Sequence, residues 1–169
     1  MDTKTARIRA LNDELRQNFT QGLAVMTPGI AALGAEAVAR IVKTIAVFDD
    51  FCHANDPHEE HDFGAFDADG HRIFFKIDYY DETLTYHSPD PADLSVTKRV
   101  ITIMLPEEYR RLQRAKFSAA KRLYRRSPKG HRRSLRAIAQ ELRAMGYTNK
   151  RGAPYSASCV KSMVKGPSP

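Results

Sequence analysis

Residues 62–80, DFGAFDADGHRIFFKIDYY, contain the clearest fold signal in the sequence. Apolar and polar residues alternate on both sides of Asp69-Gly70, and an Asp-Gly pair between two alternating segments is typical of a tight β-hairpin turn. Because side chains alternate across a strand, one face is expected to be apolar. That face carries Ile73, Phe75, Ile77 and Tyr79. The stretch therefore predicts two antiparallel strands that cover an apolar core.

The residues before the hairpin have helical periodicity. Apolar side chains three and four positions apart predict one helix over about residues 8–19 and another over about residues 38–48. Between them, Thr27-Pro28 predicts the start of a short helix that Gly34 ends. The hairpin is thus expected to pack beneath helices that precede it in the chain.

Two further strands are predicted after the hairpin, LTYH at 84–87 and RVITIML at 99–105, with a proline-rich loop at 88–93 between them. Helices followed by sequential strands indicate an α+β fold. Residues 1–105 are therefore expected to form an α+β domain, with N-terminal helices packed on a small antiparallel β-meander. No apolar run approaches the roughly 20 residues that a membrane span needs, so no membrane partner is expected.

Charge divides the chain into two parts. Residues 1–105 contain 10 Lys and Arg against 17 Asp and Glu, a net charge of −7, whereas residues 106–169 contain 17 against 3, a net charge of +14. A basic region of this density is typical of proteins that bind polyanions, because each phosphate contact releases counterions. The two cysteines, Cys52 and Cys159, suggest no disulfide framework, so a cytoplasmic location is expected.

The basic part begins with a predicted connecting helix over residues 106–126, with an apolar stripe of Tyr109, Leu112, Phe117, Ala120 and Leu123. SPKG at 127–130 is expected to end it. Over residues 127–169 we predict a helix-turn-helix module. Its first helix is capped by Ser134 and ended by Gly146, with Leu135, Ile138, Ala139, Leu142 and Met145 facing inward. Its second helix is capped by Ser156.

The second helix is expected to present small, polar and cationic side chains that can approach base edges and phosphates. The candidate DNA-binding residues are Arg132, Arg133, Arg136, Lys150, Arg151, Ser156, Ser158, Lys161, Ser162 and Lys165. A dimer is the natural way for such a module to gain affinity, so a homodimer on duplex DNA is expected.

The string SLRAIAQELRAMGYTNKRGAPYSASCVKSMV, from Ser134 onward, resembles the helix-turn-helix segment of bacterial serine recombinases and resolvases. The resemblance covers about a fifth of the chain and implies DNA binding. It does not imply strand exchange, because residues 1–105 are acidic and have no motif that fits the recombinase catalytic domain.

Residues 7–109 resemble an uncharacterised family of small bacterial proteins. Its segments here include VMTPGIAAL, FDDF, NDPHEEHDFG, KIDYYD, SPDPAD and RVITIMLPEEY. The family is a domain of unknown function found largely on plasmids and other mobile elements. The resemblance implies a fold family and a genomic setting, but no activity, cofactor or catalytic residue.

The segment HANDPHEEHDFG at 53–64 is rich in imidazole and carboxylate groups, which are ligands for metals and groups for acid-base chemistry. The candidate residues are His58, Glu60, His61, Asp62, Lys76 and Asp78. Their convergence in a cleft would favour a metal-dependent nuclease or phosphoesterase. Against this, Asn55, Asp56 and Pro57 are typical of a turn, and Lys76 is more simply explained by an ion pair across strands.

The sequence therefore favours a non-catalytic DNA-binding accessory or regulatory protein of a mobile genetic element, without a cofactor. Two alternatives remain open. One is the nuclease or phosphoesterase, and the other is a counter-defence protein whose acidic domain binds a host protein that handles nucleic acid.

Overall fold

The chain forms two compact units, Met1–Tyr109 (unit 1) and Arg110–Pro169 (unit 2). The structure is a computed structural model that describes residues 2–53, 55–125, 133–149 and 153–165. Each unit has its own apolar core, so each is described by itself.

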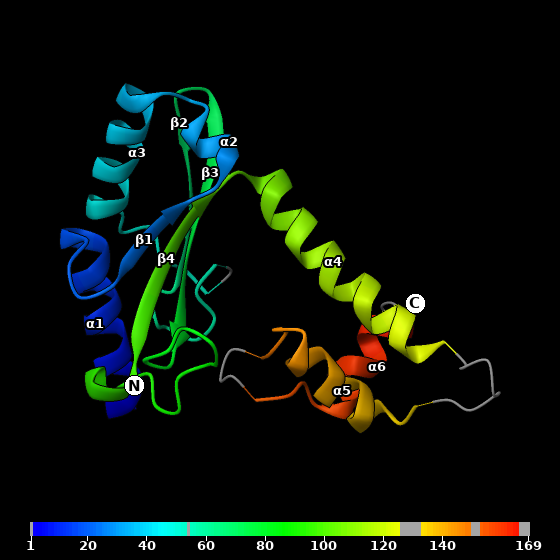
Figure 1. Cartoon of the computed structure of the whole chain (residues 1–169). Helices are drawn as coiled ribbons and strands as arrows, with labels where there is room; N and C mark the ends of the chain where they lie inside the picture. The colour runs from blue at the N-terminus through cyan, green and yellow to red at the C-terminus, as the bar shows by residue number, and fades with distance from the viewer. Residues whose placement is uncertain (1, 54, 126–132, 150–152, 166–169) are drawn as a thin grey trace. The chain divides into compact units, whose positions relative to one another are not determined.

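Unit 1 is an α+β domain, as the sequence predicts. Its elements in chain order are α1 (Thr3–Asn18), β1 (Leu23–Met26), α2 (Pro28–Ala31), α3 (Ala35–Val47), β2 (Phe63–Ala68), β3 (His71–Tyr80), the 3-10 turn η1 (Leu94–Val96) and β4 (Lys98–Met104). The strands form one sheet in the order β1-β4-β3-β2 (Figure 1). β1 runs parallel to β4, while β4 with β3 and β3 with β2 are antiparallel. The sheet is therefore mixed.

The predicted hairpin is confirmed. Ala68 pairs with His71, and the two residues between them, Asp69 and Gly70, have φ angles of 51° and 75°. Two successive positive φ angles make a tight turn whose twist matches that of the strands it joins. Within β2, a Cβ on Gly64 would lie 2.3 Å from the Phe75 ring, so only glycine allows this ring to pack here.

The core of unit 1 lies between the sheet and two helices. α1 and α3 cover one face of the sheet (Figure 1), which carries the predicted apolar residues of β3. Each of these side chains is buried: Ile73, Phe75, Ile77 and Tyr79. The opposite face carries the Phe63, Phe74 and Tyr109 rings, which contact one another with centroids 5.3 to 5.9 Å apart.

β2, β3 and β4 form the predicted antiparallel meander, but the prediction of the strands is wrong in two other respects. β1 was not predicted, because its four residues are apolar without alternation and the strand is short. Residues 84–87 form no strand and contribute only an isolated bridge between Tyr80 and His87. The Asp81 carboxylate accepts hydrogen bonds from the backbone N–H groups of Thr85 and Tyr86, at 3.1 and 3.2 Å, which folds this segment into a turn.

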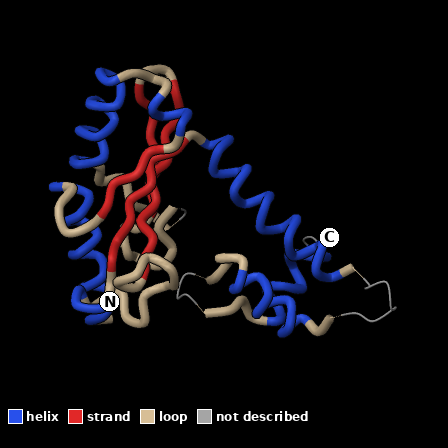
Figure 2. The backbone as a smooth tube through the Cα atoms, viewed as in Figure 1, coloured by secondary structure: helices blue, strands red, loops and turns tan. Residues whose placement is uncertain are grey.

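Unit 2 contains most of α4 (Pro106–Tyr124), together with α5 (Leu135–Ala144) and α6 (Ala157–Lys165) (Figure 2). The three helices share one core. Its buried residues are Ala119, Ala120, Leu123, Ile138, Ala139, Leu142, Val160 and Met163. α4 is thus part of the fold of unit 2 over its second half. The predicted boundary segment at 127–130 lies outside the described residues.

Three apolar residues of unit 2 that were predicted to face inward do not. Leu112 of α4 is 58% exposed, because only the second half of α4 packs on the other helices. Phe117 is 41% exposed, because it lies to the side of the helix face that Ala119, Ala120 and Leu123 bury. Met145 is 44% exposed, because α5 ends at Ala144 and Met145 no longer follows its inward face. Among the described residues, no helix combines the length and apolar character needed to cross a membrane.

Candidate nucleic-acid interface

α6 has one buried side and one exposed, cationic side. Val160 and Met163 are buried against α4 and α5. All four predicted outward residues of α6 are exposed: Ser158, Lys161, Ser162 and Lys165. The two lysines stand four residues apart, so they lie on the same side of the helix. This side combines two cationic heads with small hydroxyl side chains, a composition that can approach a phosphate backbone closely.

Serine caps begin both short helices, as predicted. Ser134 Oγ accepts a hydrogen bond from Ala137 N at 3.1 Å, and Ser156 Oγ accepts one from Cys159 N at 3.2 Å. Each cap satisfies one N–H group that would otherwise lack a partner in the first turn. Ser156 Oγ also lies 2.9 Å from Ser158 Oγ. Ser156 therefore positions the start of α6, in addition to any contact it makes with a ligand.

The acidic side chain of α5 is neutralised within unit 2. Glu141 is the sole Asp or Glu in residues 110–169. Arg133 Nε lies 2.7 Å from Glu141 Oε1, and both side chains are about two-fifths exposed. Arg136, the second residue of α5, is exposed. Of the remaining candidates, Arg132, Lys150 and Arg151 lie outside the described residues.

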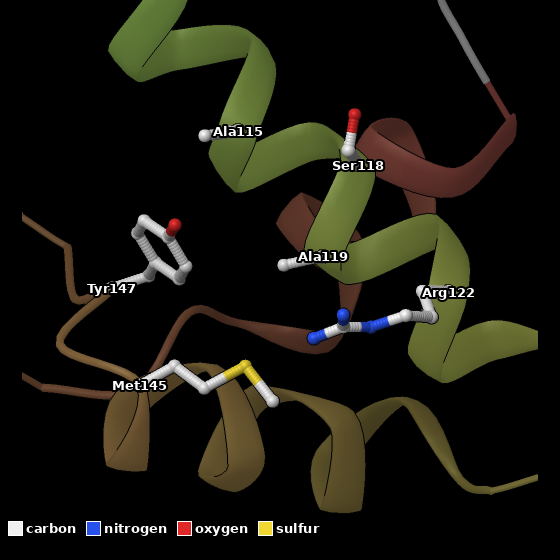
Figure 3. A pocket seen from close by; sticks show the side chains of 6 residues that line it. All are labelled: Ala115, Ser118, Ala119, Arg122, Met145 and Tyr147. Atoms are coloured by element: carbon white, nitrogen blue, oxygen red, sulfur yellow. The ribbon is translucent and has the colours of Figure 1, made fainter.

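A hollow of about 400 Å³ lies between α4 and the end of α5. It is lined by Ala115, Ser118, Ala119, Arg122, Met145 and Tyr147 (Figure 3). Ala115 and Ala119 lie on the side of α4 nearer Tyr147, and Arg122 extends from α4 toward Met145 (Figure 3). An exposed guanidinium beside small side chains provides donors for an anionic group, and it adds to the cationic surface of unit 2.

The acid and histidine segment of unit 1 forms a turn, as the Asn-Asp-Pro sequence predicts. Asp56 is 4% exposed, and its carboxylate accepts the backbone N–H groups of Glu60 and His61 at 3.0 and 3.1 Å. Glu59 and His61 have positive φ angles of 56° and 54°. The buried carboxylate thus holds a sharply turned backbone and is committed to a structural role.

His61 connects this turn to α1. Its Nδ1 lies 2.9 Å from Asp13 Oδ1, and its Nε2 lies 3.9 Å from Asp56 Oδ2. The ring stacks on Phe51 with centroids 3.8 Å apart and planes 3° apart. Because each ring nitrogen faces a carboxylate and one ring face is covered, His61 serves to attach the turn to α1.

The six candidate acid-base residues do not meet in one place. Lys76 and Asp78 form an ion pair within β3, whereas Tyr79 projects from the opposite face of that strand. Glu60 lies on the Tyr79 side, since Tyr79 OH donates to Glu60 Oε2 at 3.1 Å. Asp62 is 3% exposed, and His58 is on the surface. Glu60 to Asp62 precede β2 and are not opposite Lys76, whose partners across the sheet are Phe63 and Thr102.

Metal ligation is likewise not indicated by the geometry. Among the residues that the structure describes, no three or more His, Cys, Asp or Glu side chains are grouped so as to hold a metal ion. The sequence density of ligand-type residues in 53–64 therefore reflects a turn whose polar groups bind the backbone and α1.

A buried polar network lies behind the turn, and no periodic pattern in the sequence indicates it. Asn12 is fully buried, and its Nδ2 donates to Tyr79 OH at 2.7 Å and to the Glu60 carbonyl oxygen at 2.8 Å. Arg99, 1% exposed, donates from Nε to Asn12 Oδ1 at 3.0 Å. Burial, with the negative charges of Glu60 and Asp62, raises the pKa of Tyr79 far above its ordinary value. Tyr79 is therefore a neutral donor at any physiological pH.

The comparison with family models concerns unit 1. Residues 26–108 match the family described as Protein of unknown function (DUF3768). The match begins at the last residue of β1 and ends in the first turn of α4. A search of curated proteins and a search of solved structures each found no significant match.

The DUF3768 region contains the hairpin, β4 and the acid and histidine turn, but α1 lies before it. Asn12 and Asp13 of α1 nevertheless bind Glu60 and His61 within the matched region. α1 is therefore part of the same structural unit as the DUF3768 region. Residues 109–169, which include the cationic face of α6, lie beyond the match.

Proposed function

We propose that the chain binds duplex DNA through unit 2, in which α5 and α6 act as a helix-turn-helix and α6 enters the major groove. The observation that carries the proposal is the exposed side of α6, with Lys161 and Lys165 beside two serines and the buried side held in the unit 2 core. Small and cationic side chains on a short helix suit contacts to base edges and phosphates.

The charge of unit 2 supports the same proposal. Residues 110–169 contain 17 Lys and Arg against one Glu, and that Glu is paired with Arg133. Such an excess repels itself within a small unit unless a polyanion offsets it. Duplex DNA is the polyanion that a basic pair of short helices fits best.

Within this proposal the protein is a non-catalytic accessory or regulatory factor of a mobile genetic element that acts in the cytoplasm. The resemblance of residues 134–164 to recombinase helix-turn-helix segments supports the DNA-binding role. The resemblance of residues 7–109 to a family found largely on mobile elements supports the genomic setting. The separation of Lys76 and Asp78 from Glu60 gives no support to the nuclease alternative. Unit 1 then serves for association with protein.

A pair of charge variants tests the proposal. Replacing Lys161 and Lys165 together by alanine removes two phosphate contacts, so we expect duplex affinity to fall about tenfold to a hundredfold at moderate salt. The binding of a fluorescent duplex by the full chain is measured by anisotropy. Lys43→Ala, which removes one exposed lysine from α3 of unit 1, is the control and should bind like the unaltered chain.

Equal affinity for the double variant and the unaltered chain would overturn the assignment of α6. A loss of the same size in Lys43→Ala would show that binding follows overall charge alone. Circular dichroism of each variant checks that the helices remain folded.

A further inference from the structure

β1 is an edge strand whose apolar side chains are exposed. Leu23, Val25 and Met26 are 46%, 47% and 42% exposed, and the burial pattern shows Ala24 exposed as well. Leu23 also lines a hollow of about 500 Å³ with the exposed side chains of Leu84 and Leu94. Apart from Ala24, these side chains are five of the ten large apolar side chains that are exposed among the described residues. The exposed apolar surface of unit 1 is therefore concentrated at this edge.

The backbone of β1 is also available for pairing. Thr27 N donates to the Ile103 carbonyl oxygen of β4 at 3.0 Å, so the N–H group of Thr27 points toward β4. Backbone groups alternate in direction along a strand, so the backbone N–H and C=O groups of Val25 and Leu23 also point toward β4. The N–H and C=O groups of Ala24 and Met26 consequently point away from β4, toward the open edge of the sheet.

The other edge of the sheet is protected by charge. At the β2 end of the sheet, Asp67 pairs with Arg72 at 2.9 Å, and Asp69 pairs with Arg40 at 2.9 Å. Charged residues on an edge strand discourage pairing with another chain. β1 contains no charged residue, so it lacks this protection.

We propose that β1 pairs in antiparallel orientation with β1 of a second copy of this chain, so that the two sheets join into one. With Ala24 at the twofold axis, Gly22 lies opposite Met26 of the second copy and Leu23 lies opposite Val25. Outward backbone groups then meet outward groups, and apolar side chains meet on each face. The hollow beside Leu23 adjoins this pairing and has room for side chains of the second copy.

Charge complementarity favours a second copy in this orientation. Leu23 of β1 pairs with Val100 of β4, so Lys98, two residues before Val100, lies across from Gln21, two residues before Leu23. Lys98 is exposed. The acidic first turn of α4, which contains exposed Glu107, lies at the opposite end, because Glu108 in that turn accepts a hydrogen bond from Thr27 Oγ1 at 2.5 Å. An antiparallel pair places each end of β1 against the other end of its partner. Lys98 of each copy is thus brought toward Glu107 of the other.

Sedimentation velocity of the full chain over a range of micromolar concentrations tests the proposal, which does not rest on DNA binding by unit 2. The unaltered chain is expected to reach twice its monomer mass of 19.1 kDa. Val25→Lys places a lysine opposite Leu23 of the second copy, so the dissociation constant of the dimer should rise by about a hundredfold. Val47→Lys is the matched control, because Val47 lies on α3 and is 79% exposed. It should leave dimerisation unchanged.

Amide hydrogen exchange gives a second readout that needs no variant. The amides of Ala24 and Met26 should exchange more slowly as the concentration of the unaltered chain rises, whereas that of Thr27 should not change. A chain that stays monomeric at high concentration overturns the proposal. So does a Val25→Lys dimer as stable as the unaltered one, or exchange at Ala24 that is independent of concentration.

Discussion

Replacing Asn12 by alanine should destabilise unit 1 severely, because this one side chain joins three elements. It donates to the Glu60 carbonyl and to Tyr79 OH, and it accepts from Arg99 Nε. Asn12 is 0% exposed and Arg99 is 1% exposed, so water does not replace the lost partner of Arg99, whereas Glu60 is half-buried.

The size of the effect follows from the groups left behind. In the alanine variant, the Arg99 Nε–H and the Glu60 carbonyl oxygen each lose a partner, while Tyr79 keeps its bond to Glu60 Oε2. A buried polar group without a partner costs about 1 to 3 kcal/mol, and more when it is charged. The sum is a loss of about 4 kcal/mol in the free energy of unfolding. For a unit of this size, this lowers the melting temperature by roughly 15 to 25 °C.

Urea unfolding followed by circular dichroism measures this loss, and hydrogen exchange of the β3 amides assigns it to unit 1. Asn18→Ala is the matched control, because Asn18 lies on the same helix and is exposed. It should change the free energy of unfolding by less than about 0.5 kcal/mol. A loss below about 1 kcal/mol in Asn12→Ala would refute the view that the buried network holds α1 against the turn.

Two further predictions concern unit 1. Glu108→Ala should lower the free energy of unfolding by about 2 to 3 kcal/mol in chemical unfolding, because the Glu108 carboxylate accepts hydrogen bonds from the backbone N–H groups of Gly29 and Leu105 at 3.0 Å each. Glu107→Ala is the control, because the Glu107 side chain is exposed. An equal loss in this control would contradict the prediction. Burial lowers the pKa of His87 from its ordinary value of 6.5, an effect that nearby Asp78 opposes. As the pH falls, His87 therefore takes up a proton at a higher pH in the unfolded chain than in the folded chain. The free energy of unfolding should consequently fall as the pH drops below about 6.5. Chemical unfolding at pH 7 and at pH 5 should show a smaller fall in the free energy of unfolding for His87→Gln than for the unaltered chain. An equal fall in the two proteins would rule out His87 as its source.

The β-hairpin could be predicted from the sequence because its signals are local. Asp69-Gly70 adopts the turn that this pair favours, and alternation along β3 decides which side chains are buried. The serine caps of α5 and α6 are local in the same sense. In each case the residues that determine the structure are within a few positions of one another.

β1 and the buried network could not be predicted, because both depend on contacts between distant residues. β1 is a strand only because it pairs with β4, more than seventy residues later in the sequence. Asn12 and Arg99 are 87 residues apart, and neither stands out in its own segment. The acid and histidine segment gave the opposite error, since its composition suggested chemistry. Its side chains are instead used on backbone groups and on α1.

The most direct test of DNA binding by unit 2 is the salt dependence of duplex affinity for the full chain. A labelled duplex is titrated by anisotropy at several salt concentrations, and the logarithm of the association constant is plotted against that of salt. Contacts from Arg136, Lys161, Lys165 and the arginines of α4 to phosphates predict a slope of about −3 or steeper, at about −0.9 per contact. The absence of binding at low salt, or an affinity that does not change with salt, would contradict the account.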